Sequence, residues 1–341
     1  MTEGLPITVD IAFHGGPERV AALAAEVERR GGIGGLFVAE AAHDPYVALA
    51  LAATATGRIE IGTSIAVALA QTPMATAYSA YDVQRLSHGR LVLGLGPQIK
   101  AHITRRFAMP WSEPAARMAE YVTALRAIWH SWQTGDALDF RGDFYEHTLM
   151  PSLFSPGALD GPSPRVWLAA VGPRMLAAAG AVADGLICHP LLSRSYLDHV
   201  VLPAVHDSRD AHDRAGLPFE VSTLCMVATG RTEEAVVAAV AGVRRQIGFY
   251  ASTPAYLPVL EHHGWADLHA EAHTLSKAGR WAELGALVDD EVLETFAVVA
   301  GLPDAGAAVR ARFGGLADRV TTSMPYDADD LLALDLLNPG A

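Results

Sequence analysis

Short apolar runs alternate with amphipathic segments along most of the chain, and this alternation restricts the fold more than any other feature. The runs have the length of strands and are apolar on both faces, which is typical of a parallel sheet covered by helices. Strands are predicted at residues 7–13, 34–39, 59–68, 91–95, 165–170, 185–188, 219–228 and 320–324.

Helices are predicted after these strands, at residues 18–30, 45–56, 73–86, 113–132, 173–182, 196–214, 232–248 and 328–337. Eight strands, each followed by a helix, indicate an α/β protein with a closed (β/α)8 TIM barrel, and an open doubly wound sheet is the alternative. All 341 residues are predicted to form a single domain. Residues 133–164 and 251–302 exceed ordinary connections, and we expect them to be insertions on the barrel.

Composition and charge exclude several classes of protein. Hydrophobic residues make up 51% of the chain and charged residues 18%, so the chain is not a disordered segment. The net charge of −13, without long runs of like charge, argues against nucleic acid or an anionic membrane as the main partner. We expect a small-molecule substrate instead.

The chain shows no pattern of secretion, membrane insertion or zinc binding. Its first residues lack a cationic segment followed by a long apolar stretch, and no window approaches the length of a membrane span, so we expect a cytoplasmic protein. Cys188 and Cys225 are too few for a disulfide framework and lack the CxxC spacing of zinc sites, so we expect no metal.

Polar side chains follow the first two predicted strands, at the end where barrel enzymes build their active sites. His14 follows the first strand, and Glu40 and His43 follow the second. A histidine titrates near neutral pH and can give or take a proton, while Glu40 could orient it or act as an acid where burial raises its pKa. These three residues are the candidate catalytic groups; the alternative is that they flank or cap helices.

The junction after the fifth predicted strand suits an anion. Gly172, Pro173, Arg174 and Met175 join that strand directly to a helix, whose first backbone N–H groups and dipole attract negative charge. The alternative is an ordinary strand-to-helix turn.

Three cations follow the fourth predicted strand. Gly96 permits a close approach to the backbone, and Lys100, Arg105 and Arg106 come soon after it. In an acidic protein, this cluster favours a phosphate and further negative charge as its ligand, and a solvated helix face is the alternative.

Four segments together resemble the bacterial luciferase-like (β/α)8 flavin and deazaflavin oxidoreductases, and they are most similar to the branch that depends on coenzyme F420. The resemblance covers roughly residues 5–325. The segments that carry it, in chain order, are GTSIAVALAQTPMATA, QRLSHGRLVLGLG, GPRMLAAAGAVADGLICHP and RRQIGFYASTPAYLPVL.

This resemblance implies a set of cofactor contacts at the strand ends. It places a cis peptide bond that does not involve proline at Ser64–Ile65, behind the deazaflavin ring. It also implies that Lys100, Arg105 and Arg106 face the anionic phospholactyl oligoglutamate tail of F420. The candidate cofactor-binding residues are Ser64, Ile65, Ala66, Gly96, Pro97, Gln98, Lys100, Ala169, Gly172, Pro173, Arg174, Met175 and His189.

The sequence departs from this family at the end of the second predicted strand. Many F420 enzymes of this type have an acidic residue followed directly by a histidine that acts on the substrate. Here Glu40 matches the acid, but Ala41 stands where the histidine would be, and His43 comes two residues later.

The resemblance implies an F420-dependent oxidoreductase that moves a hydride between the deazaflavin C5 and a small organic substrate of alcohol, enone or imine type. One alternative is a monooxygenase that uses FMN or FMNH2, and another is a non-catalytic protein that binds F420 or flavin. A barrel hydrolase with paired carboxylates is a further alternative. By analogy with the family, we also expect a homodimer or a higher homo-oligomer.

Overall fold

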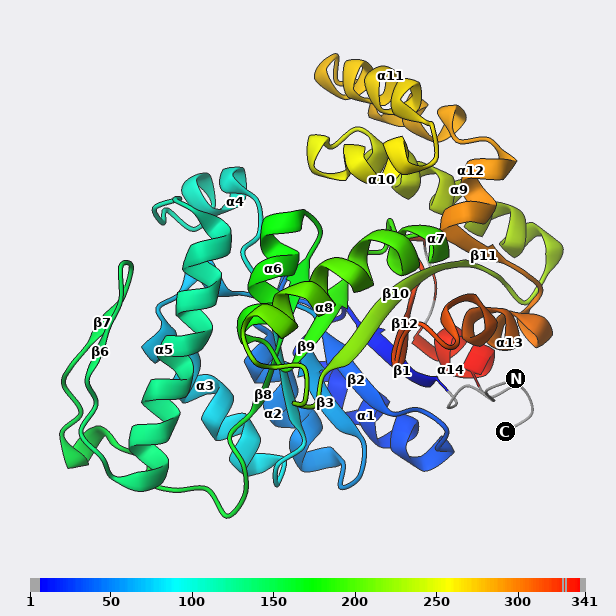
Figure 1. Ribbon diagram of the computed structural model, residues 1–341. Coiled ribbons are helices and arrows are strands. Elements are labelled where there is room, and N and C mark those ends of the chain that lie inside the picture. Colours follow the sequence, from blue (N-terminus) through cyan, green and yellow to red (C-terminus); the bar gives the residue numbers. More distant parts are fainter. Residues whose placement is uncertain (1–6, 327, 329, 338–341) are drawn as a thin grey trace.

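The computed structural model describes residues 7–326, 328 and 330–337, and eight parallel strands in it close into a barrel (Figure 1). Strand β1 pairs with β2 and β12, while β10 pairs with β9 and β12, so the ring is complete. The predicted TIM barrel is confirmed, and the open sheet is excluded. Around the ring the strands are β1 (Thr8–Phe13), β2 (Gly35–Val38), β3 (Glu60–Thr63), β5 (Leu91–Gly96), β8 (Arg165–Ala170), β9 (Gly185–Cys188), β10 (Glu220–Ala228) and β12 (Arg319–Ser323).

Helices cover the outside of this ring (Figure 1). Several begin at a proline, whose fixed φ suits the first helical position, and Asp44, Thr72 and Thr232 accept hydrogen bonds from backbone N–H groups as N-caps. The main ones are α1 (Pro17–Arg30), α2 (Pro45–Ala55), α3 (Pro73–Leu86), α5 (Pro114–Thr134), α6 (Pro173–Val182), α8 (Leu202–Ala211), α9 (Glu233–Ala251), α13 (Leu302–Phe313) and α14 (Asp330–Leu337). Helix α14 accounts for the predicted C-terminal helix from Asp330 onward; Ala328, which was included in the prediction, is not helical, and Asp329 lies outside the described residues.

Two predicted elements are interrupted. The strand expected at 59–68 ends at Thr63 and resumes as β4 (Ala66–Val67). The Ser64–Ile65 peptide bond between them is cis, as the resemblance implies. The helix expected at 196–214 is divided into α7 (Arg194–Tyr196), a π-helical turn and α8, which ends at Ala211. Pro203 follows the π-helical turn, and its missing N–H interrupts the regular α-helical ladder.

The two long segments contain helices and strands of their own, and helix α4 (Lys100–Arg105) was not predicted. Residues 133–164 contain the hairpin of β6 (Phe140–Arg141) and β7 (Glu146–His147). Residues 251–302 contain three helices and a short strand that pairs with β10. Figure 1 shows α10 and α11 above the carboxyl ends of the barrel strands, with α4 on the opposite side. The bounds are α4 (Lys100–Arg105), α10 (Leu257–His262), α11 (Ala266–Lys277), α12 (Asp290–Phe296) and β11 (Ala297–Val299). Within the described residues, no helix is long and apolar enough to cross a membrane.

Charged side chains close the amino-terminal end of the barrel. Arg319 donates hydrogen bonds of 2.6 and 2.8 Å to Asp10 and of 2.5 Å to Glu60. Arg165 bridges Glu60 and Glu220. Burial raises the pKa of Asp10 to about 6; the hydrogen bonds and charge of Arg319 oppose this shift, while the charges of Glu60 and Glu220 add to it.

An aromatic layer lies next to these charges inside the barrel. The rings of Phe37 and Trp167 stack with their centroids 5.7 Å apart, and the Arg319 guanidinium lies 5.7 and 5.6 Å from the two centroids. Val92 and Ile187 complete this buried cluster. The layer therefore separates the ion pairs from the carboxyl end of the barrel, where the strands begin to diverge into loops.

Replacing Arg319 with Met should destabilise the fold, because Asp10 would stay fully buried without its counter-charge. We expect the free energy of unfolding to fall by about 3–5 kcal/mol in urea titrations. The matched control is Arg29→Met, since the ion pair of Arg29 with Glu26 lies on the outer surface of α1. A midpoint shift in the control as large as that of Arg319→Met would contradict the role of the ion-pair layer.

Candidate active site at the carboxyl ends of the strands

A cavity of about 440 Å³ opens at the carboxyl ends of the barrel strands, and Ile187 of the aromatic layer contributes to its wall. The other walls come from the ends of β3, β5, β8, β9 and β10 and from the segment between α9 and α10. Among the predicted cofactor contacts, those that line it are Ser64, Ile65, Gly96, Pro97, Gln98, Ala169, Gly172, Met175 and His189. Residues far apart in the chain thus surround one hollow, and their cofactor-binding role remains a prediction.

A second cavity of about 470 Å³ adjoins the first, since Gly172 and Met175 line both. Pro173 and Arg174 line this second cavity, together with the first residues of α5. The amino-terminal ends of α5 and α6 therefore face the same space, where backbone N–H groups and helix dipoles favour an anion.

Close contact between β3 and β5 shapes the floor of the first cavity. The Thr63 hydroxyl donates a 2.6 Å hydrogen bond to the Gly94 carbonyl, and a Cβ atom added at Gly94 would lie 2.0 Å from the Thr63 carbonyl oxygen. A Cβ atom added at Gly96 would lie 2.9 Å from Cδ1 of Ile65. Only glycine lets β5 lie this close to the end of β3 and lets the Ile65 side chain pack over Gly96.

The three catalytic candidates do not line either cavity. Glu40 is half-buried, and its carboxylate accepts a 2.7 Å hydrogen bond from the Val67 N–H, which holds β4 in place. Burial raises the pKa of Glu40, and the Val67 N–H opposes that shift. His14 and His43 are exposed. A catalytic role for these residues stays a prediction that the geometry does not favour.

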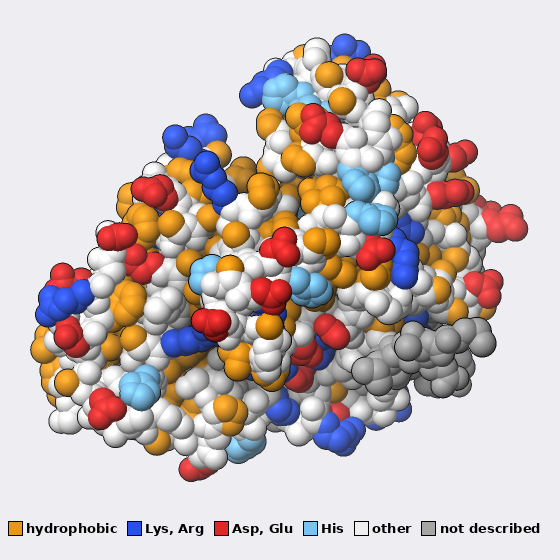
Figure 2. Space-filling view, viewed as in Figure 1, with side chains coloured by type: hydrophobic (Ala, Val, Ile, Leu, Met, Phe, Trp, Pro, Cys, Tyr) orange, Lys and Arg blue, Asp and Glu red, His pale blue; other side chains and the backbone are white. Residues whose placement is uncertain are grey.

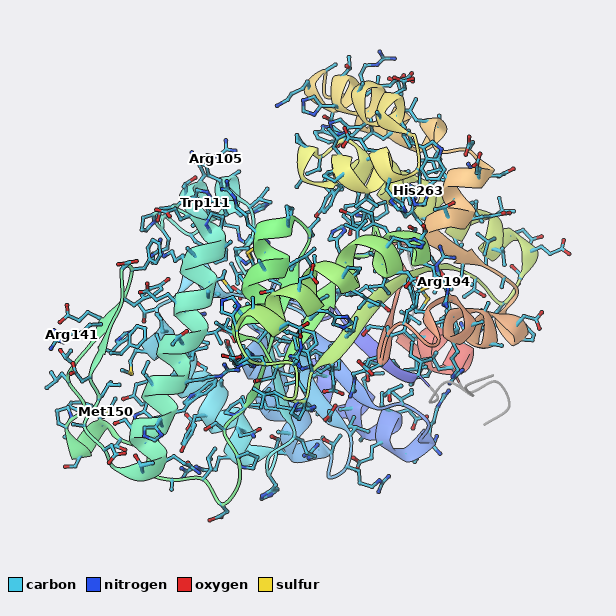
Figure 3. The ribbon with its side chains drawn as sticks, viewed as in Figure 1. Arg105, Trp111, Arg141, Met150, Arg194 and His263 are labelled. Carbon is cyan, nitrogen blue, oxygen red and sulfur yellow. The ribbon has the colours of Figure 1, made fainter. Side chains whose placement is uncertain are left out.

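The predicted cations lie on and beside α4, at the rim of the mouth. Lys100, Arg105 and Arg106 are exposed, and none of them lines the cavity, whereas the neighbouring Ile99 does. Figure 2 shows blue cationic side chains on this side of the hollow and orange hydrophobic surface below them, and Figure 3 shows Arg105 at the outer tip of α4. Ala66 is buried in β4 and is also outside the cavity.

A polar pair lies in the wall beside β9. The Leu191 N–H donates to Nδ1 of His189 at 3.1 Å, and Nε2 of His189 lies 2.8 Å from the Tyr256 hydroxyl. The His189 and Tyr256 rings stack at 4.2 Å between centroids, and Tyr250 meets the His189 ring edge-on at 4.5 Å. Burial lowers the pKa of His189 to about 3, so its imidazole is neutral at physiological pH.

Sequence reasoning missed Leu224, Ala255 and Tyr256, all of which line the first cavity. The segment RRQIGFYASTPAYLPVL contains two of them and was singled out for its resemblance, but its spacing gives no sign of which side chains turn toward the barrel.

The fold and the shared hollow are those of a barrel enzyme, and the chain belongs to the luciferase-like monooxygenase family, whose sequence model matches residues 7–319. It is therefore an oxidoreductase. An uncharacterized protein of Mycobacterium tuberculosis is 50% identical over 304 residues, which cover 89% of this chain and 88% of that protein.

Two further relatives carry descriptive names. The phthiodiolone/phenolphthiodiolone dimycocerosates ketoreductase of a Mycobacterium species is 32% identical over 147 residues, which cover 42% of this chain and 37% of that protein. The coenzyme F420-dependent tetrahydromethanopterin reductase of Methanopyrus kandleri has a solved structure with a TM-score of 0.77 and 19% identity, over 98% of this chain and 97% of that one. The likeness to the Methanopyrus kandleri structure shows that the two chains share a fold.

The low pKa of His189 predicts a pH-dependent contribution to stability. Unfolding restores the usual histidine pKa of about 6.5, so the unfolded chain binds a proton that the folded chain does not bind between about pH 3 and 6.5. Stability should therefore fall as the pH decreases through this window. Compared with His189→Gln, the wild type should lose about 2 kcal/mol more between pH 7 and pH 5 in urea titrations. Equal losses in the two proteins would show that folded His189 takes up the proton.

Proposed function

We propose that this protein is a coenzyme F420-dependent oxidoreductase that transfers a hydride between the deazaflavin C5 and a small organic substrate. The observation that carries the proposal is the pair of adjoining cavities, of which one is lined mainly by apolar groups and the other faces two helix amino termini. When bound, F420 supplies or accepts the hydride, and the protein orients the reacting partners.

The residues fit the successive parts of this cofactor. Ile65, Gly96 and Ala169 offer an apolar surface to the ring, and Gly172 leaves room that a larger side chain would occupy. The helix start at Gly172 and Pro173 suits the phosphate. The exposed cations on and after α4 suit the acidic tail, which FMN lacks, so the charge distribution favours F420 over FMN.

A carbonyl or alcohol substrate is the class that the site supports best. The cavity is lined mostly by apolar side chains and backbone, and a relative that is 32% identical over part of its length is named as a ketoreductase. An FMN-dependent monooxygenase remains the second candidate, because the matched family carries that description.

Titration of the purified protein with F420 and with FMN, followed by fluorescence quenching, tests the cofactor. We expect F420 to bind more tightly and to weaken as salt is added. Changing Lys100, Arg105 and Arg106 together to Ala should raise the Kd for F420 by about tenfold, because each exposed cation contributes modestly. The Kd for FMN should change less.

The control for this variant removes three cations elsewhere. Arg29, Arg58 and Arg141 are exposed, and Figure 3 shows Arg141 on the hairpin far from α4, so their joint change to Ala alters the net charge equally. An equal loss of F420 affinity in both triple variants would exclude a tail site at α4. Tighter binding of FMN than of F420, together with oxygen consumption, would favour the monooxygenase.

Gly172→Leu should block the cofactor without disturbing the fold. A Cβ atom at Gly172 meets no atom within 4 Å, and this residue lines both cavities, so the added side chain projects into the space that the cofactor needs. We expect the Kd for F420 to rise at least about tenfold at an unchanged thermal midpoint. Gly216→Leu is the control, since its Cβ also meets nothing within 4 Å and it lines neither cavity. Unchanged F420 binding in Gly172→Leu would contradict this placement.

A further inference from the structure

Tyr256 reaches the cavity from outside the barrel. It ends the short turn Pro254–Tyr256 between α9 and α10, and with Ala255 it lines the cavity whose other walls are strand ends. Its ring stacks on His189 and lies 5.7 Å from the ring of Tyr250, so two aromatic neighbours hold it. The Tyr256 hydroxyl is thereby fixed at the boundary between the barrel and the segment that covers it.

The hydrogen bonds of His189 determine where the protons are. Because the Leu191 N–H donates to Nδ1, that nitrogen carries the lone pair, and the neutral ring has its proton on Nε2. Nε2–H therefore donates to the Tyr256 oxygen at 2.8 Å. The hydroxyl proton of Tyr256 is not used in this bond and can be donated to a ligand.

The other cavity residues with an exchangeable side-chain proton suit the task less well. Burial raises the pKa of the Cys188 thiol to about 12, and burial together with the charge of Tyr250 also raises the pKa of Tyr256 above its usual range, so acidity does not separate the two. The Cys188 side chain is buried, whereas that of Tyr256 is only partly buried and can reach a ligand. The proton of His189 is engaged by Tyr256, and the hydroxyl of Ser64 is an alcohol, which is a weaker acid than a phenol. The phenol is also a stronger acid than the alcohol that carbonyl reduction produces, so proton transfer from Tyr256 is favourable.

We propose that Tyr256 is a catalytic residue that gives its phenolic proton to the carbonyl oxygen of a ketone or aldehyde, and that His189 is the positioning residue that holds it. The inference rests on the proposed function. The carbonyl carbon gains the hydride from reduced F420 and the carbonyl π bond breaks, while the oxygen gains the proton of Tyr256 and becomes a hydroxyl. The phenolate then takes a proton from water, and the Nε2–H of His189 stabilises it in the interval. Alcohol oxidation runs through the same steps in reverse.

The test compares the wild type with Tyr256→Phe, which keeps the stacked ring and removes only the hydroxyl. A first readout involves no turnover: oxidised F420 and carbonyl-labelled 2-octanone are bound together, and the carbonyl stretch is measured by difference infrared spectroscopy. We expect the band to lie at lower wavenumber in the wild type, because it accepts a hydrogen bond, and to return toward the free position in Tyr256→Phe.

The second readout is steady-state reduction of methyl ketones, from acetone to 2-decanone, by reduced F420. Loss of the acid should lower kcat by about 10²- to 10⁴-fold, while the Kd for F420 stays within about twofold. The matched control is Tyr250→Phe, because that ring contacts the same histidine but does not line the cavity. Its kcat should stay within about threefold of the wild-type value.

The outcomes separate this inference from the proposed function. A wild type that binds no F420 overturns both. A wild type that binds F420 but reduces none of these ketones overturns the role of Tyr256 and leaves the cofactor assignment standing. Unchanged infrared bands and a kcat within about threefold in Tyr256→Phe also overturn that role, whereas a selective loss in Tyr256→Phe supports it.

Discussion

The side chains that point into the barrel change in charge and size from one end to the other, and this gradient decides where a ligand can bind. Strand β8 shows it in three residues: Arg165 belongs to the ion pairs, Trp167 to the aromatic layer and Ala169 to the cavity wall. Alternate residues of a strand are about 7 Å apart and point to the same side, so these groups form separate layers. The cavity exists because its layer is built from small residues.

The barrel and its covering segment supply different parts of the site. Strand ends and helix starts offer backbone and small side chains, which suit a large anionic cofactor. The segment after α9 adds the Tyr256 hydroxyl and is joined to the residues after β9 by further hydrogen bonds, between Ser193 and His263 and between Ser195 and His262, each 2.8 Å long. Under the proposed function, the groups that contact the substrate can therefore vary while the proposed cofactor contacts at the strand ends stay the same.

The barrel could be predicted because most strands are local apolar runs, and the closure of eight strands places all their carboxyl ends together. Elements without a local signal were missed, such as β11 and the break before Pro203. Gly96 and Gly172 could be placed at the site from the sequence, because they directly follow predicted strands whose carboxyl ends meet in a closed barrel. The place of Tyr256 at the cavity could not be predicted, because it depends on how the segment after α9 folds back over the carboxyl ends of the strands. Nor does any spacing reveal that the Glu40 carboxylate turns away to the Val67 N–H.

The indole of Trp167 sets the depth of the hollow, because it is fully buried between Ala169 and the guanidinium of Arg319. A smaller residue there would open a path from the cavity to the buried pair of Asp10 and Arg319. Room for a bulkier substrate can therefore be made only at the mouth, in the segment after α9, because Trp167 and the ion pairs close the barrel below the cavity.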